Sequence, residues 1–220
     1  MTSQQIRHHL TDALLMAYSA GTLAEAFSLT VAAHVSMCDD CRARLGAFDS
    51  LGGALVEGCE ASVMSAASLE ATLARIEAGT PPTAPARPRA PRRNAVLPAP
   101  VRDYVGGDLD AVRWRPIGMG VKQAILPTAR DARARLLYIP AGIAVPDHGH
   151  NGTELTLVLQ GAFADARDHF GPGDIEIADA ALDHMPVADI GADCICLAAT
   201  DAPLRFHSLI ARIAQPFLRI

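Results

Sequence analysis

Apolar residues recur at helical spacing through the first third of the chain. They return every three or four positions, as on one face of an α-helix. Four segments show the pattern: residues 10–23, 23–37, 39–55 and 68–79. Thr11 can cap the first segment, Gly21 can end it, and Ser68 can cap the last. Their short connections predict an all-α unit of about four helices.

The hydrophobic pattern changes after residue 100. Short runs rich in β-forming residues, separated by Gly, Pro and Asp at intervals of about ten residues, replace the helical repeat. The clearest runs are residues 121–127, 134–140, 154–163, 173–179 and 193–200. This rhythm predicts a β-sandwich or a β-barrel.

A segment rich in proline and arginine, residues 80–100, separates the two patterns. Proline lacks a backbone N–H and fixes φ, so this segment should be an extended, semi-stiff linker. We therefore predict an α plus all-β protein of two domains. The helical domain covers residues 1–79, and the β-domain covers residues 101–220.

Composition narrows the class of protein further. Half of the 220 residues are hydrophobic and a fifth are charged, which predicts a sizeable core. The net charge of −5 disfavours direct nucleic-acid binding. An odd number of cysteines argues against a secreted disulfide scaffold. The sequence shows no signal peptide and no apolar run long enough for a transmembrane helix, so we expect a cytoplasmic protein that does not bind membranes.

The stretch "HVSMCDDC", residues 34–41, carries the first candidate chemistry. It places His34, Cys38 and Cys41 at spacings of four and three. These side chains share a face of one helix, or the cysteines flank a tight turn if the helix breaks near residues 39–40. Either geometry brings together an imidazole and two thiolates, which zinc binds well. The alternative is a pair of inert buried thiols beside a core histidine.

A structural zinc needs a fourth ligand, and His8 and His9 are the candidates. The pattern His-x3-Cys-x2-Cys, with an earlier histidine in a helical unit, resembles the zinc-binding anti-sigma domain. The spacing in that family selects His9 as a ligand beside the three residues above, and leaves His8 facing solvent or the partner. Residues 1–79 contain nine acidic side chains and four arginines, which suits a basic protein partner such as a sigma factor. A merely solubilising acidic face is the alternative.

A second constellation lies in residues 142–161, "GIAVPDHGHNGTELTLVLQG". His148 and His150 stand at i and i+2 and can point to one side of a strand, while Glu154 follows on the next strand. With His184 further along, these residues offer a mixed N/O site suited to Zn, Fe, Mn or Ni. The alternative is a set of polar residues in a surface loop.

This spacing resembles the first of the two cupin motifs at every position. The second motif is looser, because His184 lies further downstream than usual and the following asparagine is missing. The resemblance implies a cupin β-barrel or jelly roll with a metal held by His148, His150, Glu154 and His184. Zinc is expected there, and other divalent metals remain open.

The remaining cysteines and histidines have weaker patterns. Cys194 and Cys196 stand at i and i+2 of an apolar strand, so both can face the barrel interior, either as redox groups near the metal or as small packing residues. We assign no role to Cys59, and we expect His169 and His207 to be ordinary surface or core residues.

The pairing of a zinc anti-sigma domain with a cupin resembles the ChrR-type anti-sigma factors over nearly the whole chain. The similarity includes "RHHLTDALL", "DCICLAATDAPLRF" and "QPFLRI". It implies a non-enzymatic regulator of transcription. Its helical domain would sequester an extracytoplasmic-function sigma factor, and its cupin would release that factor under oxidative stress, singlet oxygen in particular.

Two other functions remain open at this stage. A metal-dependent cupin enzyme, a dioxygenase or isomerase, could carry the helical domain as its regulator. Such an enzyme needs polar groups around its metal, whereas the neighbouring sequence is mostly apolar, with Thr153, Thr156 and Gln160 as exceptions. A structural module with two passive zinc sites is the other alternative.

Overall fold

The computed structural model describes residues 5–79 and 95–206. Five α-helices precede the strands: α1 (Asp12–Ser19), α2 (Glu25–Met37), α3 (Asp39–Glu57), α4 (Ser68–Ala78) and α5 (Ala99–Val105). A 3-10 turn, η1 (Leu109–Ala111), follows them. The four predicted helices are confirmed, and α5 adds a short fifth.

The helix ends follow local sequence, with one exception. The Thr11 side chain accepts a hydrogen bond from the backbone N–H of Leu14 and so caps α1 as predicted. The prediction that Ser68 caps α4 is wrong: Ser68 is the first helical residue, Ala67 occupies the cap position, and the Ser68 hydroxyl bonds to Ser65. Helix α4 therefore begins without a side-chain cap.

The β-domain consists of three antiparallel sheets. The large one has the order β1-β2-β3-β11-β5-β8, and the two small ones have the orders β10-β6-β7 and β12-β4-β9. The strands are β1 (Arg115–Gly118), β2 (Val121–Ile125), β3 (Arg133–Ile139), β4 (His148–His150), β5 (Glu154–Gln160), β6 (Phe163–Ala164), β7 (His169–Phe170), β8 (Ile175–Ala178), β9 (Asp183–His184), β10 (Val187–Ala188), β11 (Cys194–Thr200) and β12 (Leu204–Phe206). The five predicted runs supply five of the six strands in the large sheet.

The central strands β5 and β11 of the large sheet are buried on both faces. Side chains alternate along each strand, so Leu155 and Leu157 of β5 face the helices whereas Val158 faces the barrel interior. In β11, Leu197 likewise joins the helical side and Cys196 joins the interior. This double burial explains why these strands read as nearly continuous apolar runs.

Helix α2 joins the two halves of the molecule. It packs against β3, β5 and β11, and residues of α1, α2 and the sheet form one hydrophobic cluster. Seven α2 residues are buried, from Ala26 to His34, and they lie on several sides of the helix. A helix that is apolar almost all round has to be covered on more than one side.

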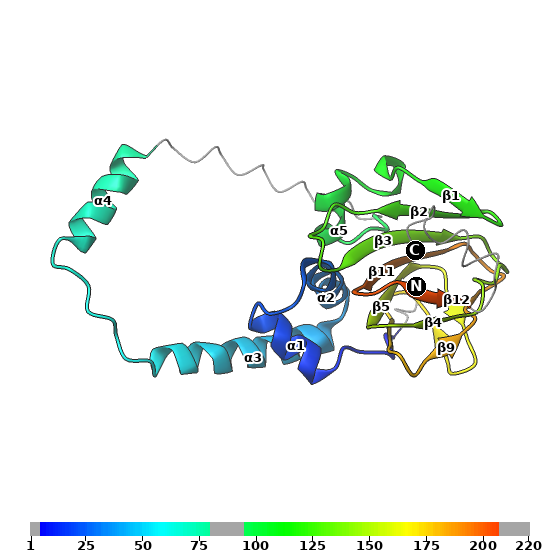
Figure 1. Ribbon diagram of the computed structural model, residues 1–220, viewed down its shortest axis with the longest axis horizontal. Helices are drawn as coiled ribbons and strands as arrows, with labels where there is room; N and C mark the ends of the chain where they lie inside the picture. Colours follow the sequence, from blue (N-terminus) through cyan, green and yellow to red (C-terminus); the bar gives the residue numbers. More distant parts are fainter. Residues whose placement is uncertain (1–4, 80–94, 207–220) are drawn as a thin grey trace.

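Helices α3 and α4 extend away from this body. Figure 1 shows α3 leading outward from α1 and α2, with α4 beyond it. Along the fully described α4, no side chain is buried, and in α3 only Cys41 is buried. Among the described residues, no helix has both the length and the apolar character needed to cross a bilayer.

The end of the predicted linker is ordered. Leu97 is buried, and α5 begins at Ala99 with a proline in its first turn, a position where the missing N–H costs nothing. Tyr104 of α5 donates a hydrogen bond from its hydroxyl to Glu25 at the start of α2. Residues 80–94 of the linker lie outside the described residues.

Candidate metal centres

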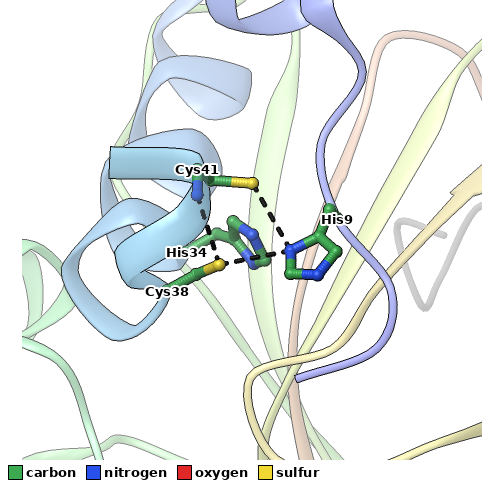
Figure 2. A group of neighbouring side chains, drawn as sticks. All are labelled: His9, His34, Cys38 and Cys41. Atoms are coloured by element: carbon green, nitrogen blue, oxygen red, sulfur yellow. Dashed lines mark hydrogen bonds between the residues drawn. The ribbon is translucent and has the colours of Figure 1, made fainter. Parts of the chain in front are cut away.

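The predicted zinc ligands of the helical unit converge. Helix α2 ends at Met37 and α3 begins at Asp39, so the helix breaks at Cys38 itself. The Cys38 sulfur accepts a hydrogen bond from the N–H of Cys41, which turns both thiols to one side. His34 reaches them from the last turn of α2, and His9 from the arm before α1 (Figure 2).

The spacing of these ligand atoms suits a tetrahedral cation. One atom from each of His9, His34, Cys38 and Cys41 lies within 4.8 Å of the others. The His9 Nδ1 atom is 3.2 Å from the Cys38 sulfur and 3.7 Å from the Cys41 sulfur. Nitrogen and sulfur ligands of a tetrahedral zinc lie about 3.5 Å apart. The four side chains therefore fit a zinc ion without rearrangement of the fold.

His34 is the strongest sign that this cluster holds a ligand. Its side chain is fully buried, and neither ring nitrogen makes a hydrogen bond of good geometry to a described residue, the Gly173 backbone being the polar group near enough to raise its pKa. Burial lowers the pKa of His34 to about 4, so the ring is neutral and keeps a lone pair available. A buried polar group without partners is costly, and a cation would satisfy it.

The thiols need positive charge near them. Burial raises the pKa of Cys41, which disfavours a bare thiolate there. Arg44 opposes this effect from one side: its Nη1 lies 3.8 Å from the Cys41 sulfur while the same guanidinium pairs with Asp12. A divalent cation at the cluster would stabilise both thiolates directly.

His8 is held against the β-domain, and its side chain is only 22% exposed, so it does not project freely into solvent. Its ring packs on Phe170, and its Nε2 lies 3.0 Å from Asp168. The backbone N–H groups of Arg7 and His8 both donate to Asp174. The arm that leads into His9 is therefore bound to the β-domain.

Three of the four predicted cupin ligands gather at one point. His148, His150 and His184 are buried, and one nitrogen from each lies within 4.8 Å of the others. The Nε2 atoms of His150 and His184 are 3.3 Å apart, the separation expected for two nitrogen ligands of one tetrahedral ion. The Nδ1–H of His148 donates to the Pro146 carbonyl, which leaves its Nε2 lone pair free.

Glu154 lies beside this histidine cluster. Its Oε2 is 3.9 Å from His150 Nδ1, and its Oε1 accepts a hydrogen bond from the Thr156 hydroxyl. A rotation of the side chain would bring the carboxylate toward the histidines, because Glu154 also lines the cavity that they border. The arrangement holds three nitrogen donors in place with a carboxylate within reach.

Two further carboxylates were missed in the sequence. Asp165 and Glu176 lie 3.0 and 3.2 Å from His184 Nδ1. Burial alone would lower the pKa of His184, but Glu176 and Asp165 together raise it. Their position fixes the Nδ1–H tautomer, so that Nε2 of His184 faces the other histidines. The charged residue in the apolar run "DIEIAD" was the available signal for Glu176.

The other predicted positions have plainer surroundings. Cys194 and Cys196 are buried free thiols whose sulfurs lie 3.4 Å apart. The hydrogen bond to Cys194, together with burial, raises the pKa of Cys196. Cys59 is exposed. His169 is half-exposed and pairs with Asp189, as an ordinary surface residue does, and His207 lies outside the described residues.

Comparison with known proteins agrees with both halves of the fold. Residues 103–202 match the family model described as the ChrR cupin-like domain. The chain is 60% identical to the anti-sigma-E factor ChrR of Cereibacter sphaeroides over 98% of its own length and 99% of that protein. It is also similar to a chain in the crystal structure of Rhodobacter sphaeroides SigE in complex with the anti-sigma ChrR. That match has 58% identity and a TM-score of 0.78, and covers 90% of this chain and 100% of the other. The identity runs through the helical unit and the cupin together, and the chain therefore belongs to the ChrR family of anti-sigma factors.

Proposed function

We propose that this protein binds an extracytoplasmic-function sigma factor and keeps it from core RNA polymerase. The observation that carries the proposal is the 60% identity, over nearly the whole chain, to a protein named as an anti-sigma factor. A relative of similar identity has been crystallised with its sigma factor. The match covers 98% of this chain and 99% of the relative, so nearly all residues that could form the sigma-binding surface lie within it.

The exposed face of α3 and α4 is the surface we assign to this partner. Leu51 and Leu55 of α3, and Leu69, Leu73 and Ile76 of α4, are each at least half exposed. In both helices these residues share one face, because their spacings are three or four. We call these five residues the apolar stripe. Five large apolar side chains exposed together on two helices indicate a surface that another protein covers.

We assign one zinc ion to each metal centre. In the helical unit it would be held by His9, His34, Cys38 and Cys41 as a structural ion that fixes the junction of α2 and α3. Such an ion would set the direction in which α3 leaves the body, and with it the position of the apolar stripe. Loss of the ion should therefore weaken the sigma complex as well as the fold.

In the cupin, His148, His150 and His184 would hold the second ion, with Glu154 as the fourth ligand. Zinc suits the three imidazoles, and other divalent metals would be accepted by the same donors. When bound, this ion would supply a Lewis acid beside the cavity that His148, His184 and Glu154 line. The chain itself orients the donors through Pro146, Asp165 and Glu176.

We infer that the cupin controls release of the sigma factor under oxidative stress, singlet oxygen in particular. A route through the structure supports this inference. Glu154 and Thr156 face the interior of β5, while Leu155 and Leu157 on the same strand pack toward α2. A change around the cupin ligands would thus move residues that support the helix carrying His34. A signal has to favour the released state in this way to shift the equilibrium.

The alternative of a cupin enzyme is not favoured. The relative that matches over the whole chain is named for binding a sigma factor, and the cupin is one part of that protein. The fold itself does not imply catalysis, since function depends on the site that a fold carries. The protein is best described as a regulator.

Co-purification tests the proposed function. The full chain is expressed together with an extracytoplasmic-function sigma factor from the same genome, and the mass of the product is measured. We expect a one-to-one complex that contains zinc. A chain that elutes alone, with every such sigma factor of that genome, would overturn the proposal.

A further inference from the structure

The barrel interior contains a cavity of about 400 Å³, large enough for a small molecule. Most of its wall is apolar, with Val121, Leu137, Ile139 and Phe163 among the side chains that face it. The histidines His148 and His184 border one part of it. Neither centre described above accounts for the apolar part of this cavity.

One row of residues across the large sheet is an exception to the apolar lining. The strand register places Arg135 beside Ala198, Ala198 beside Thr156, and Thr156 beside Glu176. All four residues line the cavity. Ala198, the cross-strand neighbour of Arg135, has a small side chain, and both residues border the cavity.

Arg135 has no counter-ion at contact distance. Arg135 is only 5% exposed, and its side chain forms no hydrogen bond or ion pair within the part of the chain that the structure describes; Glu154 acts on it only from beyond ion-pair distance. Burial lowers the pKa of Arg135, but from a value so high that the group stays charged at neutral pH. An unpaired charge in such a place is costly, and a chain gains stability when an anion reaches it.

The carboxylates of the cavity are engaged elsewhere. Glu154 accepts a hydrogen bond from Thr156 and lies near His150, and Glu176 lies against His184. The anion that would pair with Arg135 therefore has to come from outside the described chain.

We propose that this cavity binds an aliphatic carboxylate, with the carboxylate group on Arg135 and the hydrocarbon chain along the apolar wall. A guanidinium binds the two oxygens of a carboxylate in one plane, which the single arginine of this row can provide. A phosphate would need more donors than a wall dominated by Val, Leu, Ile and Phe offers. The site is distinct from the sigma-binding function, and its occupation is measured on the free chain.

Isothermal titration calorimetry of the full chain with decanoate tests the proposal. We expect saturable binding of one decanoate per chain. Decanol, which has the same hydrocarbon chain without the charge, should bind at least tenfold more weakly. Acetate, which has the charge without the chain, should also bind at least tenfold more weakly. Equal binding of decanol and decanoate, or no binding of decanoate, would overturn the proposal.

Two variants locate the site. Arg135→Met keeps the straight side chain, removes the charge, and should weaken decanoate binding at least tenfold while decanol binding stays unchanged. Arg133→Gln is the matched control, since it removes an exposed charge two residues earlier on the same strand and should bind decanoate as the parent does. Ala198→Leu retains Arg135 but fills the adjoining space, and should also weaken binding. A thermal melt shows that each variant is folded, and decanoate affinity unchanged by both Arg135→Met and Ala198→Leu would refute the site.

Discussion

Replacing Asp174 by asparagine tests the joint between the N-terminal arm and the cupin. The carboxylate is 3% exposed and accepts three backbone hydrogen bonds. Its Oδ1 receives the N–H groups of Arg7 at 2.6 Å and His8 at 2.9 Å, and its Oδ2 receives that of Gly171 at 2.9 Å. The arm leads directly into His9, so this one side chain holds a predicted zinc ligand in place.

The expected cost follows from these three bonds. Asparagine has the same shape, but only one of its two terminal groups can accept a hydrogen bond. One charge-assisted hydrogen bond is lost, which costs about 1.5–3 kcal/mol. The other two weaken to the strength of hydrogen bonds between neutral groups. We expect Asp174→Asn to lower the free energy of unfolding by about 3 kcal/mol. Asp168→Asn, beside the same His8 but half exposed, should cost less than about 1 kcal/mol.

Urea unfolding, followed by circular dichroism, measures both variants against the parent. Burial alone would raise the pKa of Asp174, but the three backbone N–H groups lower it overall. A carboxylate whose pKa is depressed by folding stabilises the protein above its unfolded pKa, near 3.9, and this contribution is lost as the pH falls through the folded value. The difference between parent and Asp174→Asn should thus be constant at neutral pH and vanish in strong acid. Equal losses for Asp174→Asn and Asp168→Asn would refute the reasoning.

Four further predictions concern the metal centres and the partner. Cys38→Ser should lower the zinc content by one equivalent and weaken sigma binding, whereas exposed Cys59→Ser should change neither; full zinc in Cys38→Ser, measured by atomic absorption, contradicts the assignment. Leu73→Asp should weaken sigma binding at least tenfold, the loss expected for a central apolar contact, without lowering the melting temperature; unchanged affinity in calorimetry removes α4 from the interface. Glu154→Ala should repress normally but respond poorly to singlet oxygen in a reporter assay, and full induction would exclude the cupin as the sensor. Residues 1–79 alone should still bind sigma in a pull-down, yet unfold at a lower temperature because α2 loses the sheet that covers it; binding by the full chain only would contradict a separable helical domain.

The sequence could predict much of the fold because its long elements carry strong patterns. The strands at residues 154–160 and 194–200 are buried on both faces, so their apolar runs are unmistakable. Strands of two residues, such as β6 and β9, are too short for any periodicity and were missed. The packing of α2 on the sheet was also missed, although a helix as uniformly apolar as residues 25–37 signals burial on several sides.

The ligand pattern was predictable where it is local and unpredictable where it depends on tertiary contacts. Cys38 and Cys41 are close in sequence and meet through one turn. Glu176 and Arg135 lie in strands whose charges could face either side, and only the register shows that both face the cavity. The contacts of His8 could not be predicted from the sequence because its neighbours, such as Asp168, come from a distant part of the chain.

Run-off transcription measures most directly whether this protein restrains a sigma factor. Core RNA polymerase, the sigma factor that co-purifies with the chain, and a promoter which that factor recognises are combined with increasing amounts of the full protein. We expect transcription to fall to background at a one-to-one ratio with sigma, and to be spared when the Cys38→Ser protein is added instead. Undiminished transcription at a large excess of the intact, zinc-loaded chain would contradict the anti-sigma function.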